Sequence, residues 1–211
     1  MKYINYLLLI FYLLPYNVIA QDSLSNNILE KLRLKTQSYT SIQIEFEHIF
    51  SNKSAGINEQ NSGVLELEGD NFRINLAQQL IINNGSTHWI YLKEMNEVQI
   101  MEYDPEEEDA LSPNKLFTLY NNDYKNTYID EKMIGNEKMH IIDLFPKKSN
   151  PIMKIRLTIN AEKNQIHILA LYDKNGGVYT YKIRKFKTNK TLPPFIFNTK
   201  DYPEIEVIDL R

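Results

Sequence analysis

The chain has 211 residues, a length that fits one domain with a sizeable core. Its formal net charge of −3 is too acidic for the basic footprint of a nucleic-acid-binding protein, so we expect no nucleic-acid partner. It contains no cysteine, which excludes disulfides, thiol nucleophiles and zinc sites built on thiolates. The 14 Tyr and 9 Phe residues, set against only 7 Gly, favour β-sheet over helix.

Residues 1–20 have the pattern of a removable secretory signal. Lys2 precedes an apolar run over residues 6–14 that is too short to span a bilayer, and the run ends before a site at Ala20 where a signal peptidase could cut. We expect cleavage there and a single domain over residues 21–211. An uncleaved anchor is the alternative, but polar residues from Gln21 onward interrupt the span of about 20 apolar residues that it needs. Since Gln21 stands where an acylated protein would need Cys, we expect an unanchored protein.

One long helical pattern follows the signal, over residues 22–40, with Ser23 or Ser25 as the predicted N-cap. Its apolar residues recur at near-helical spacing: Leu24, Ile28, Leu29, Leu32 and Leu34. From Ser41 the period changes to two, which indicates a half-buried antiparallel strand. Further strands are predicted at 63–68, 71–76, 79–83, 87–93 and 97–103, joined by links short enough for hairpins.

The strand pattern is interrupted in the middle of the chain. Residues 104–112 are acidic and contain a proline, and Pro113 then introduces a short apolar helix with Leu116, Phe117 and Leu119. Strands resume at 126–131, 138–145, 152–160, 165–173 and 177–187. About ten or eleven strands of this kind predict a mainly β (α+β) chain whose sheet curls into a barrel or bends strongly, with two helices left to cover the opening.

The sequence offers little evidence of catalysis or metal binding. The four histidines, His48, His88, His140 and His167, stand far apart, and we interpret each as a residue on a strand face. No nucleophile, phosphate-binding or metalloprotease motif is present, so we expect no enzyme, no metal and no cofactor. The acidic run over residues 106–109 is interpreted as a solvated loop, with a calcium site or a docking patch as alternatives.

The remaining signal is a set of apolar residues on strands and on the short helix. They could form an ordinary packed core. A curved sheet with this many strands also encloses a space wider than its own side chains fill, which predicts a cavity for apolar ligands. The candidate cavity residues are Ile42, Ile44, Phe46, Leu65, Leu67, Phe72, Ile74, Trp89, Tyr91, Val98 and Ile100, and the candidate lid residues are Leu116, Phe117 and Leu119.

An ordered set of short segments carries a family resemblance. The segments are Ser62-Gly63-Val64-Leu65, Asn71-Phe72-Arg73-Ile74, residues 79–85, Trp89-Ile90-Tyr91, residues 96–100, Pro113 with Leu116 and Phe117, residues 144–147, residues 195–197 and residues 207–211. No single segment is diagnostic, but the ordered set is fairly specific, and it resembles the family of periplasmic outer-membrane lipoprotein carrier proteins, LolA. Two departures are visible, because Ile74 stands where the family commonly has Trp, and residues 68–70 stand where many members have a basic residue and Pro.

The resemblance implies a fold and a function. The fold would be an unclosed antiparallel β-barrel with a helical lid over a hydrophobic cavity. The protein would act in the periplasm as a monomer. It would bind the acyl chains of lipoproteins, receive these from an inner-membrane lipoprotein-releasing ABC transporter, and hand them to an outer-membrane lipoprotein receptor.

Two other function classes fit the same residues less well. A lipid- or lipoprotein-binding sensor of the same fold would regulate a partner rather than carry cargo, and we expect such a sensor to have a further C-terminal domain beyond Arg211. A periplasmic hydrolase would need a converging set of acid, base and nucleophile, which His48, Glu45 and their neighbours do not supply. We therefore expect a carrier.

The predicted lid gives a first test. If Leu116 closes the cavity with its apolar side chain, Leu116→Glu weakens that closure, because burying an unpaired carboxylate is strongly unfavourable. We expect fewer lipoproteins to reach the outer membrane of cells that carry this variant, measured by membrane fractionation. Normal sorting in these cells would contradict the lid assignment.

Overall fold

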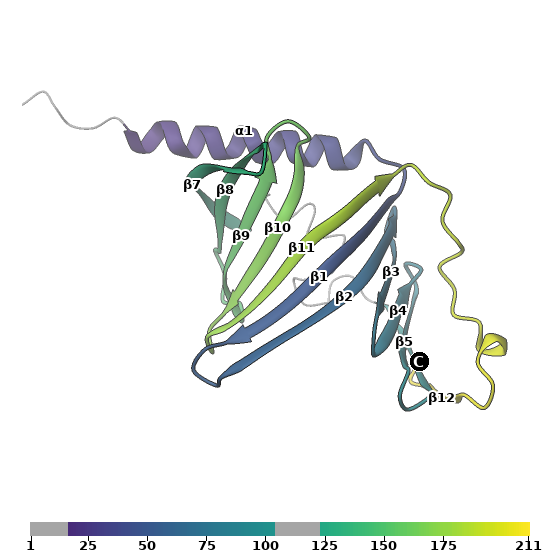
Figure 1. Cartoon of the computed structure of the whole chain (residues 1–211). Coiled ribbons are helices and arrows are strands. Elements are labelled where there is room, and N and C mark those ends of the chain that lie inside the picture. The colour runs from purple at the N-terminus through teal and green to yellow at the C-terminus, as the bar shows by residue number, and fades with distance from the viewer. Residues whose placement is uncertain (1–16, 104–122) are drawn as a thin grey trace, which may run out of the picture.

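The computed structural model describes residues 17–103 and 123–211, and side chains from residue 23 onward. It contains a twelve-stranded sheet in the order β12-β6-β5-β4-β3-β2-β1-β11-β10-β9-β8-β7 (Figure 1). The strands are β1 Ile42–Asn52, β2 Ile57–Glu68, β3 Asn71–Leu76, β4 Gln79–Asn83, β5 Thr87–Leu92, β6 Glu97–Glu102, β7 Tyr124–Ile134, β8 Glu137–Pro146, β9 Ile152–Asn160, β10 Gln165–Asp173, β11 Gly177–Thr188 and β12 Glu206–Asp209.

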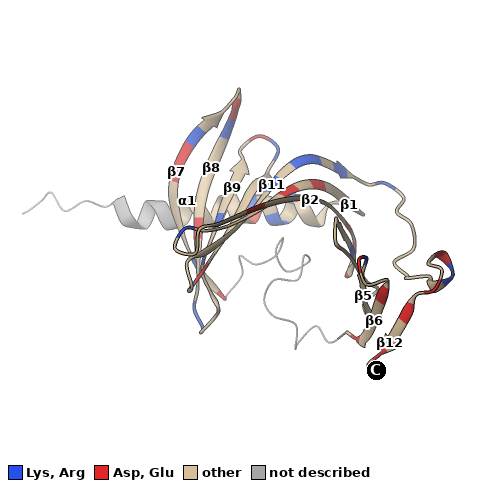
Figure 2. Cartoon of the chain, turned by 60° about the horizontal axis from the view of Figure 1, so that its bottom comes forward, with Lys and Arg blue, Asp and Glu red and all other residues tan. Residues whose placement is uncertain are grey.

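The sheet is strongly curved and does not close into a barrel. Consecutive strands pair as antiparallel hairpins within two runs, β1 to β6 and β7 to β11, and the pairing of β1 with β11 joins the runs. Figure 2 shows the result as an arch, with β5, β6 and β12 at one side and β7 and β8 at the other. The predicted fold class, an unclosed and curved antiparallel sheet, is confirmed.

Helix α1, Asn17–Gln37, packs against β7 and β10 at one end of the arch (Figure 1). Ile28, Leu29 and Leu32 are buried in the main core, as the helical spacing predicted. Leu24 and Leu34 are exposed, because they lie outside the stripe that meets the sheet. No helix in residues 17–103 or 123–211 is long and apolar enough to cross a membrane.

The prediction that Ser23 or Ser25 caps the helix is wrong, because α1 already begins at Asn17. Ser25 is fully buried and donates its hydroxyl hydrogen bond to the side-chain oxygen of Asn126 on β7. The Asn126 amide in turn donates to the side chain of Asn26 over 2.8 Å. The Ser25 side chain, which the sequence pattern indicated as a helix cap, instead connects α1 to β7 through hydrogen bonds.

The predicted strands correspond closely to the observed ones, with two corrections. β1 and β2 form a longer hairpin than predicted, because residues 57–62 of β2 are mostly polar and exposed and so lack the alternation that marks a buried strand. β12 was not predicted as a strand. It is short and mostly exposed, and its parallel pairing with β6 depends on a long return of the chain after β11.

The predicted hairpin links Gly69-Asp70 and Lys174-Asn175-Gly176 are confirmed as tight connections. Gly69 has φ of +57° and Gly176 has φ of +82°, a left-handed conformation that side chains disfavour. The Asp173 carboxylate accepts hydrogen bonds of 2.7 Å from the backbone N–H groups of Asn175 and Gly177, which fixes the β10–β11 turn.

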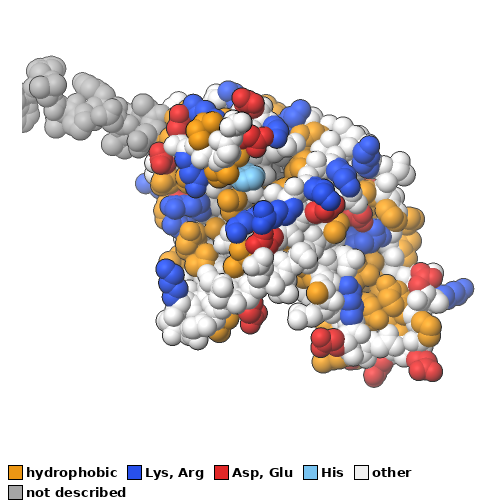
Figure 3. All heavy atoms as spheres, viewed as in Figure 1, with side chains coloured by type: hydrophobic (Ala, Val, Ile, Leu, Met, Phe, Trp, Pro, Cys, Tyr) orange, Lys and Arg blue, Asp and Glu red, His pale blue; other side chains and the backbone are white. Residues whose placement is uncertain are grey.

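The outer face of the sheet carries rows of ion pairs. On β11 and β1, Lys185 lies 2.8 Å from Glu45, and Glu47 pairs with both Lys182 and Arg184. Figure 2 marks a row of Lys and Arg positions along β11, and Figure 3 shows Lys and Arg side chains on this outer side. The inner face of the same strands is apolar, so alternation sends charge outward and hydrocarbon inward.

The most buried carboxylate among the described ion pairs gives a stability test. The Asp143 side chain is 4% exposed and accepts two hydrogen bonds from Arg156, of 2.6 and 2.8 Å, while Lys154 lies 3.3 Å away. Arg156→Met removes both bonds from a buried carboxylate, and we expect a loss of about 1–3 kcal/mol in the free energy of unfolding, measured with urea.

Lys185→Met is the matched control, since it breaks an exposed pair and is expected to change stability by less than about 1 kcal/mol. Equal losses for the two variants would show that burial of Asp143 does not govern the strength of its pair.

Candidate functional site

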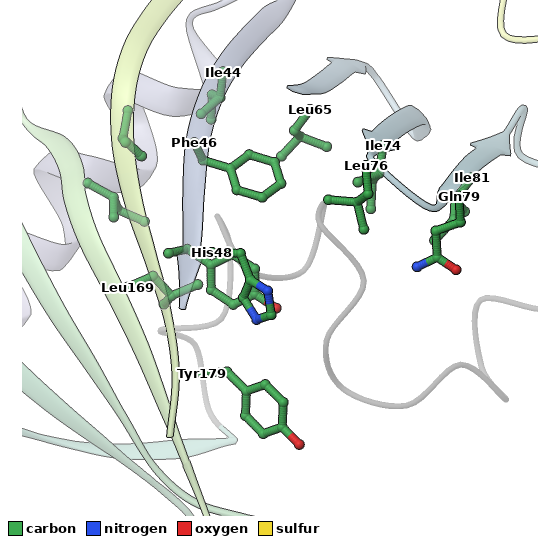
Figure 4. A pocket seen from close by; sticks show the side chains of 13 residues that line it. Ile44, Phe46, His48, Leu65, Ile74, Leu76, Gln79, Ile81, Leu169 and Tyr179 are labelled. Atoms are coloured by element: carbon green, nitrogen blue, oxygen red, sulfur yellow. The ribbon is translucent and has the colours of Figure 1, made fainter. Parts of the chain in front are cut away.

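An apolar hollow of about 370 Å³ lies on the inner face of the sheet, over the central strands (Figure 4). Its volume is within the range of about 300–1,000 Å³ found for small-ligand sites. Strands from both runs of the sheet supply its walls. The lining residues are Ile44, Phe46, His48, Leu65, Ile74, Leu76, Gln79, Ile81, Ile166, Leu169, Tyr179, Tyr181 and Ile183.

Strand β1 supplies the floor of the hollow through alternate residues. Ile44, Phe46 and His48 point to the same face because side chains on a strand alternate. A β-bulge interrupts the pairing with β11 between Glu45 and Phe46, so that β11 carries one extra residue at this point. The bulge shifts the alternation of β11 by one residue. As a result, Ile183 before the bulge and Phe186 after it both face the inner core.

The wall formed by β2, β3 and β4 is a row of directly opposed aliphatic side chains. Leu65 pairs with Ile74, and Ile74 pairs with Ile81. Gly63 on β2 leaves the space in this wall that Phe46 and Leu76 fill, because a Cβ there would lie 2.6 Å from Leu76 Cδ2 and 2.7 Å from Phe46 Cζ. The absence of a side chain at Gly63 therefore shapes the hollow.

Among the described residues, the lining contains no Lys, Arg, Asp or Glu. The described side chain there that titrates near neutral pH is His48, whose pKa is lowered by burial, an effect that the negative charge of Glu59 partly opposes. Burial also raises the pKa of the Tyr181 phenol, which keeps it neutral. The described walls of the hollow therefore form an uncharged environment at neutral pH, suited to hydrocarbon and unsuited to ions.

A second groove of about 450 Å³ adjoins the hollow and shares Tyr179 and Tyr181 with it. Ile152 and Leu171 supply apolar surface there. Its rim is polar, with Asp173, Lys174 and Asn175 at the β10–β11 turn, so the inner surface becomes more polar toward that turn.

The candidate cavity residues fall into three groups. Ile44, Phe46, Leu65 and Ile74 line the hollow. Ile42, Leu67 and Phe72 belong to the same core cluster but are buried beside the hollow rather than lining it. The structure thus brings together the candidates from β1, β2 and β3.

The third group is Trp89, Tyr91, Val98 and Ile100, which lies elsewhere. These side chains form a second cluster on the opposite face of β5 and β6, with Phe195 and Phe197 of the segment that follows β11. The residues of β5 on the same face as the hollow are His88, Ile90 and Leu92, of which Ile90 pairs with Ile81 and Leu92 with Gln79. Both faces of these strands carry apolar residues, so the sequence pattern did not indicate which face meets the hollow.

Most of the lining that the sequence analysis missed comes from β10 and β11. Leu169, Tyr179, Tyr181 and Ile183 contribute a whole wall. The alternation of Tyr179, Tyr181 and Ile183 was visible in the sequence as the face of a predicted strand. That this strand lies beside β1 was not visible, because the two are far apart in the chain.

The histidines lie on four different strands, as predicted. His140 on β8 contacts the Tyr128 hydroxyl at 3.1 Å through Nδ1, and His88 packs edge-on against Phe72. Within the described parts of the chain, no group of three His, Asp or Glu side chains could hold a metal ion.

The candidate lid residues Leu116, Phe117 and Leu119 and the acidic run over residues 106–109 lie outside the described residues.

The model of the family "Outer membrane lipoprotein carrier protein LolA" matches residues 37–200. An outer-membrane lipoprotein carrier protein of Legionella pneumophila (strain Corby) is 23% identical over 197 residues, which cover 90% of this chain and 94% of the relative. The family match therefore includes α1 only at its end and extends through all the strands of the hollow.

Two solved structures share the fold. An uncharacterized conserved protein from Thermus thermophilus has a TM-score of 0.56 and 12% identity, over 88% of this chain and 98% of that one. LprF from Mycobacterium bovis has a TM-score of 0.52 and 12% identity, over 82% of this chain and 98% of that one. At this identity the likeness concerns the fold alone.

The close contacts of Gly63 give a test of how the hollow is shaped. Gly63→Val would push Phe46 and Leu76 out of their positions, and we expect a loss of about 1–3 kcal/mol in the free energy of unfolding together with weaker binding of an apolar fluorescent dye. Ser62→Val, one residue earlier and exposed, is the control and should leave dye binding unchanged. Unaltered dye binding in Gly63→Val would argue against this wall as part of the site.

Proposed function

This chain belongs to the family of outer-membrane lipoprotein carrier proteins, LolA, and we propose that it carries lipoproteins by enclosing their acyl chains in the hollow on the inner face of the sheet. The observation that carries the proposal is the composition of that hollow, whose described lining holds mainly aliphatic and aromatic side chains and no Lys, Arg, Asp or Glu. Such a lining accepts hydrocarbon, so the proposed role is binding and transfer rather than catalysis.

The energetics of an exposed acyl chain explain why a carrier is needed. Each buried CH₂ group is worth about 0.8 kcal/mol, so a chain of roughly a dozen methylenes would cost on the order of 10 kcal/mol in water. A lipoprotein therefore does not leave a membrane unaided at a useful rate. A soluble protein that covers the chain lowers this free energy and lets the cargo diffuse.

The route that fits this role begins and ends at membranes. We propose that the protein is exported by its signal, is cut after Ala20, and acts as a monomer in the periplasm. Acylated lipoproteins would enter it from an inner-membrane lipoprotein-releasing ABC transporter and leave it to an outer-membrane lipoprotein receptor. Because Gln21 follows the proposed cut, the carrier itself would stay unanchored.

Delivery requires that the carrier bind its cargo less tightly than the next acceptor does. A lid that packs well on the empty hollow and is displaced by cargo would lower the net affinity, because closing the lid competes with binding. Leu116, Phe117 and Leu119 remain our proposal for this lid.

The proposal is tested by the acyl chains that the protein holds. Native mass spectrometry of protein purified from the periplasm should show bound acylated protein. Leu76→Glu places a carboxylate in the lining, and we expect it to lower the bound fraction by about tenfold or more, since an unpaired charge is costly beside hydrocarbon.

Ile196→Glu is the control, because Ile196 is 60% exposed and lies outside the hollow. It should leave the bound fraction unchanged. Transfer of the bound cargo to outer-membrane vesicles should follow for the wild type, and a protein that binds acylated cargo but never releases it would be a sensor rather than a carrier. Absence of acylated protein from the wild-type material would refute the proposed function.

A further inference from the structure

His48 is the one basic side chain in the described lining of the hollow. Figure 4 shows its imidazole projecting from β1 into the hollow, with the ring nitrogens on the side away from the strand. Its ring lies 4.9 Å from the ring of Tyr181 and is stacked with that of Tyr179 at 6.2 Å between centroids. The two tyrosines therefore hold the imidazole in one orientation at the floor of the site.

The His48 imidazole has unused hydrogen-bonding capacity. Nε2 is buried, and it has no hydrogen-bond partner among the described residues. A neutral imidazole carries one N–H donor and one acceptor nitrogen, and leaving a buried polar group unpaired is unfavourable. Burial lowers the His48 pKa, so the ring is neutral at pH 7 and above. In the tautomer that carries its hydrogen on Nε2, the hollow thus contains a neutral hydrogen-bond donor that the described protein does not satisfy.

We propose that His48 donates a hydrogen bond to the ester or amide carbonyl that links an acyl chain to its parent molecule, and that the hollow selects such linked chains over free fatty acids. This inference rests on the proposed function, because it concerns the same hollow. It adds a chemical criterion to what would otherwise be a purely apolar site.

The selection follows from charge. An ester or amide carbonyl is neutral, so one hydrogen bond compensates for its transfer out of water. A free fatty acid is ionised at neutral pH, and its carboxylate would need a cation or several donors at the same depth. The other polar side chains in the described lining are the neutral groups Gln79, Tyr179 and Tyr181, and the Lys and Arg row of β11 lies on the outer face.

One cation lies close enough to offer an alternative. Lys174 lines the adjoining groove, which shares Tyr179 and Tyr181 with the hollow. If it bound a fatty-acid carboxylate, the chain could still reach toward the hollow and the preference would disappear. The Asp173 carboxylate at the same rim opposes an anion there, which favours the assignment to His48.

The test compares two ligands with the same acyl chain, monopalmitoylglycerol and palmitate. Each displaces an apolar fluorescent dye from the full chain, at about pH 8, where palmitate is ionised and His48 is neutral, and below the concentrations at which micelles form. For the wild type we expect monopalmitoylglycerol to bind about tenfold or more tightly than palmitate.

The variant His48→Phe keeps an aromatic ring but loses both nitrogens. We expect it to bind monopalmitoylglycerol about three- to tenfold more weakly, with dye and palmitate affinities unchanged. His167→Phe on β10, outside the lining of the hollow, and Lys174→Met in the adjoining groove are the controls and should keep the wild-type preference.

Four outcomes would count against the inference, and they differ in what they overturn. Equal affinities for the two ligands in the wild type, or an unchanged preference in His48→Phe, would overturn it while leaving the apolar carrier site intact. A preference that changes in Lys174→Met would assign recognition to the groove and overturn the role of His48. A wild-type protein that binds neither dye nor either ligand would overturn the proposed function itself.

Discussion

The pairing of β1 with β11 is the interaction on which the rest of the structure depends. It extends from Ile42 opposite Thr188 to Asn52 opposite Gly177 and joins two runs of hairpins that have no other contact of this kind within the described residues. Without this ladder the chain would form two separate meanders, each with an exposed apolar face. With it, one continuous sheet curves around a shared interior, and the hollow lies directly over the seam.

The seam is also where aromatic side chains gather. Phe46 contacts Tyr181, and Phe50 stacks on Tyr179, both across the β1–β11 pair. Such cross-strand pairs stabilise a sheet beyond the area that they bury. The bulge between Glu45 and Phe46 sets the position of these rings, because an extra residue on β11 bends the strand and increases its twist. Curvature, ring packing and the floor of the hollow therefore have one local origin.

The outer face of the sheet is covered differently at the two sides of the arch. Around β1 and β11 the outer face is covered by paired charges, and it faces solvent. Around β5 and β6 the outer face is apolar, and Phe195 and Phe197 of the C-terminal segment cover it before β12 adds to the edge of β6. A Phe195 contact with the Arg73 guanidinium, at 5.1 Å from the ring centroid, continues this cover toward β3. The C-terminal segment therefore covers the outer face of these strands, and the hollow lies on the inner face of the sheet.

Local structure could be predicted from the amino-acid sequence. Alternation of apolar and polar residues predicted nearly every strand, and glycines such as Gly69 and Gly176 predicted the hairpin turns. The helical spacing of Ile28, Leu29 and Leu32 predicted their burial in the core. Neighbours in the chain pair with one another in this fold, so a local pattern was enough. The order of the segments indicated the family as well.

Which apolar faces enclose the hollow depends on the long-range packing of the sheet. Tyr91 and Val98 alternate as regularly as Ile44 and Phe46, yet they meet the C-terminal segment rather than the hollow. Tyr179 and Tyr181 became part of the site because β11 returns to β1 across more than a hundred residues. Alternation of apolar residues predicts that one face of a strand is buried, but it does not predict which element covers that face. The covering element is fixed by long-range strand pairing and by the single-residue bulge that sets which side chains of β11 face inward.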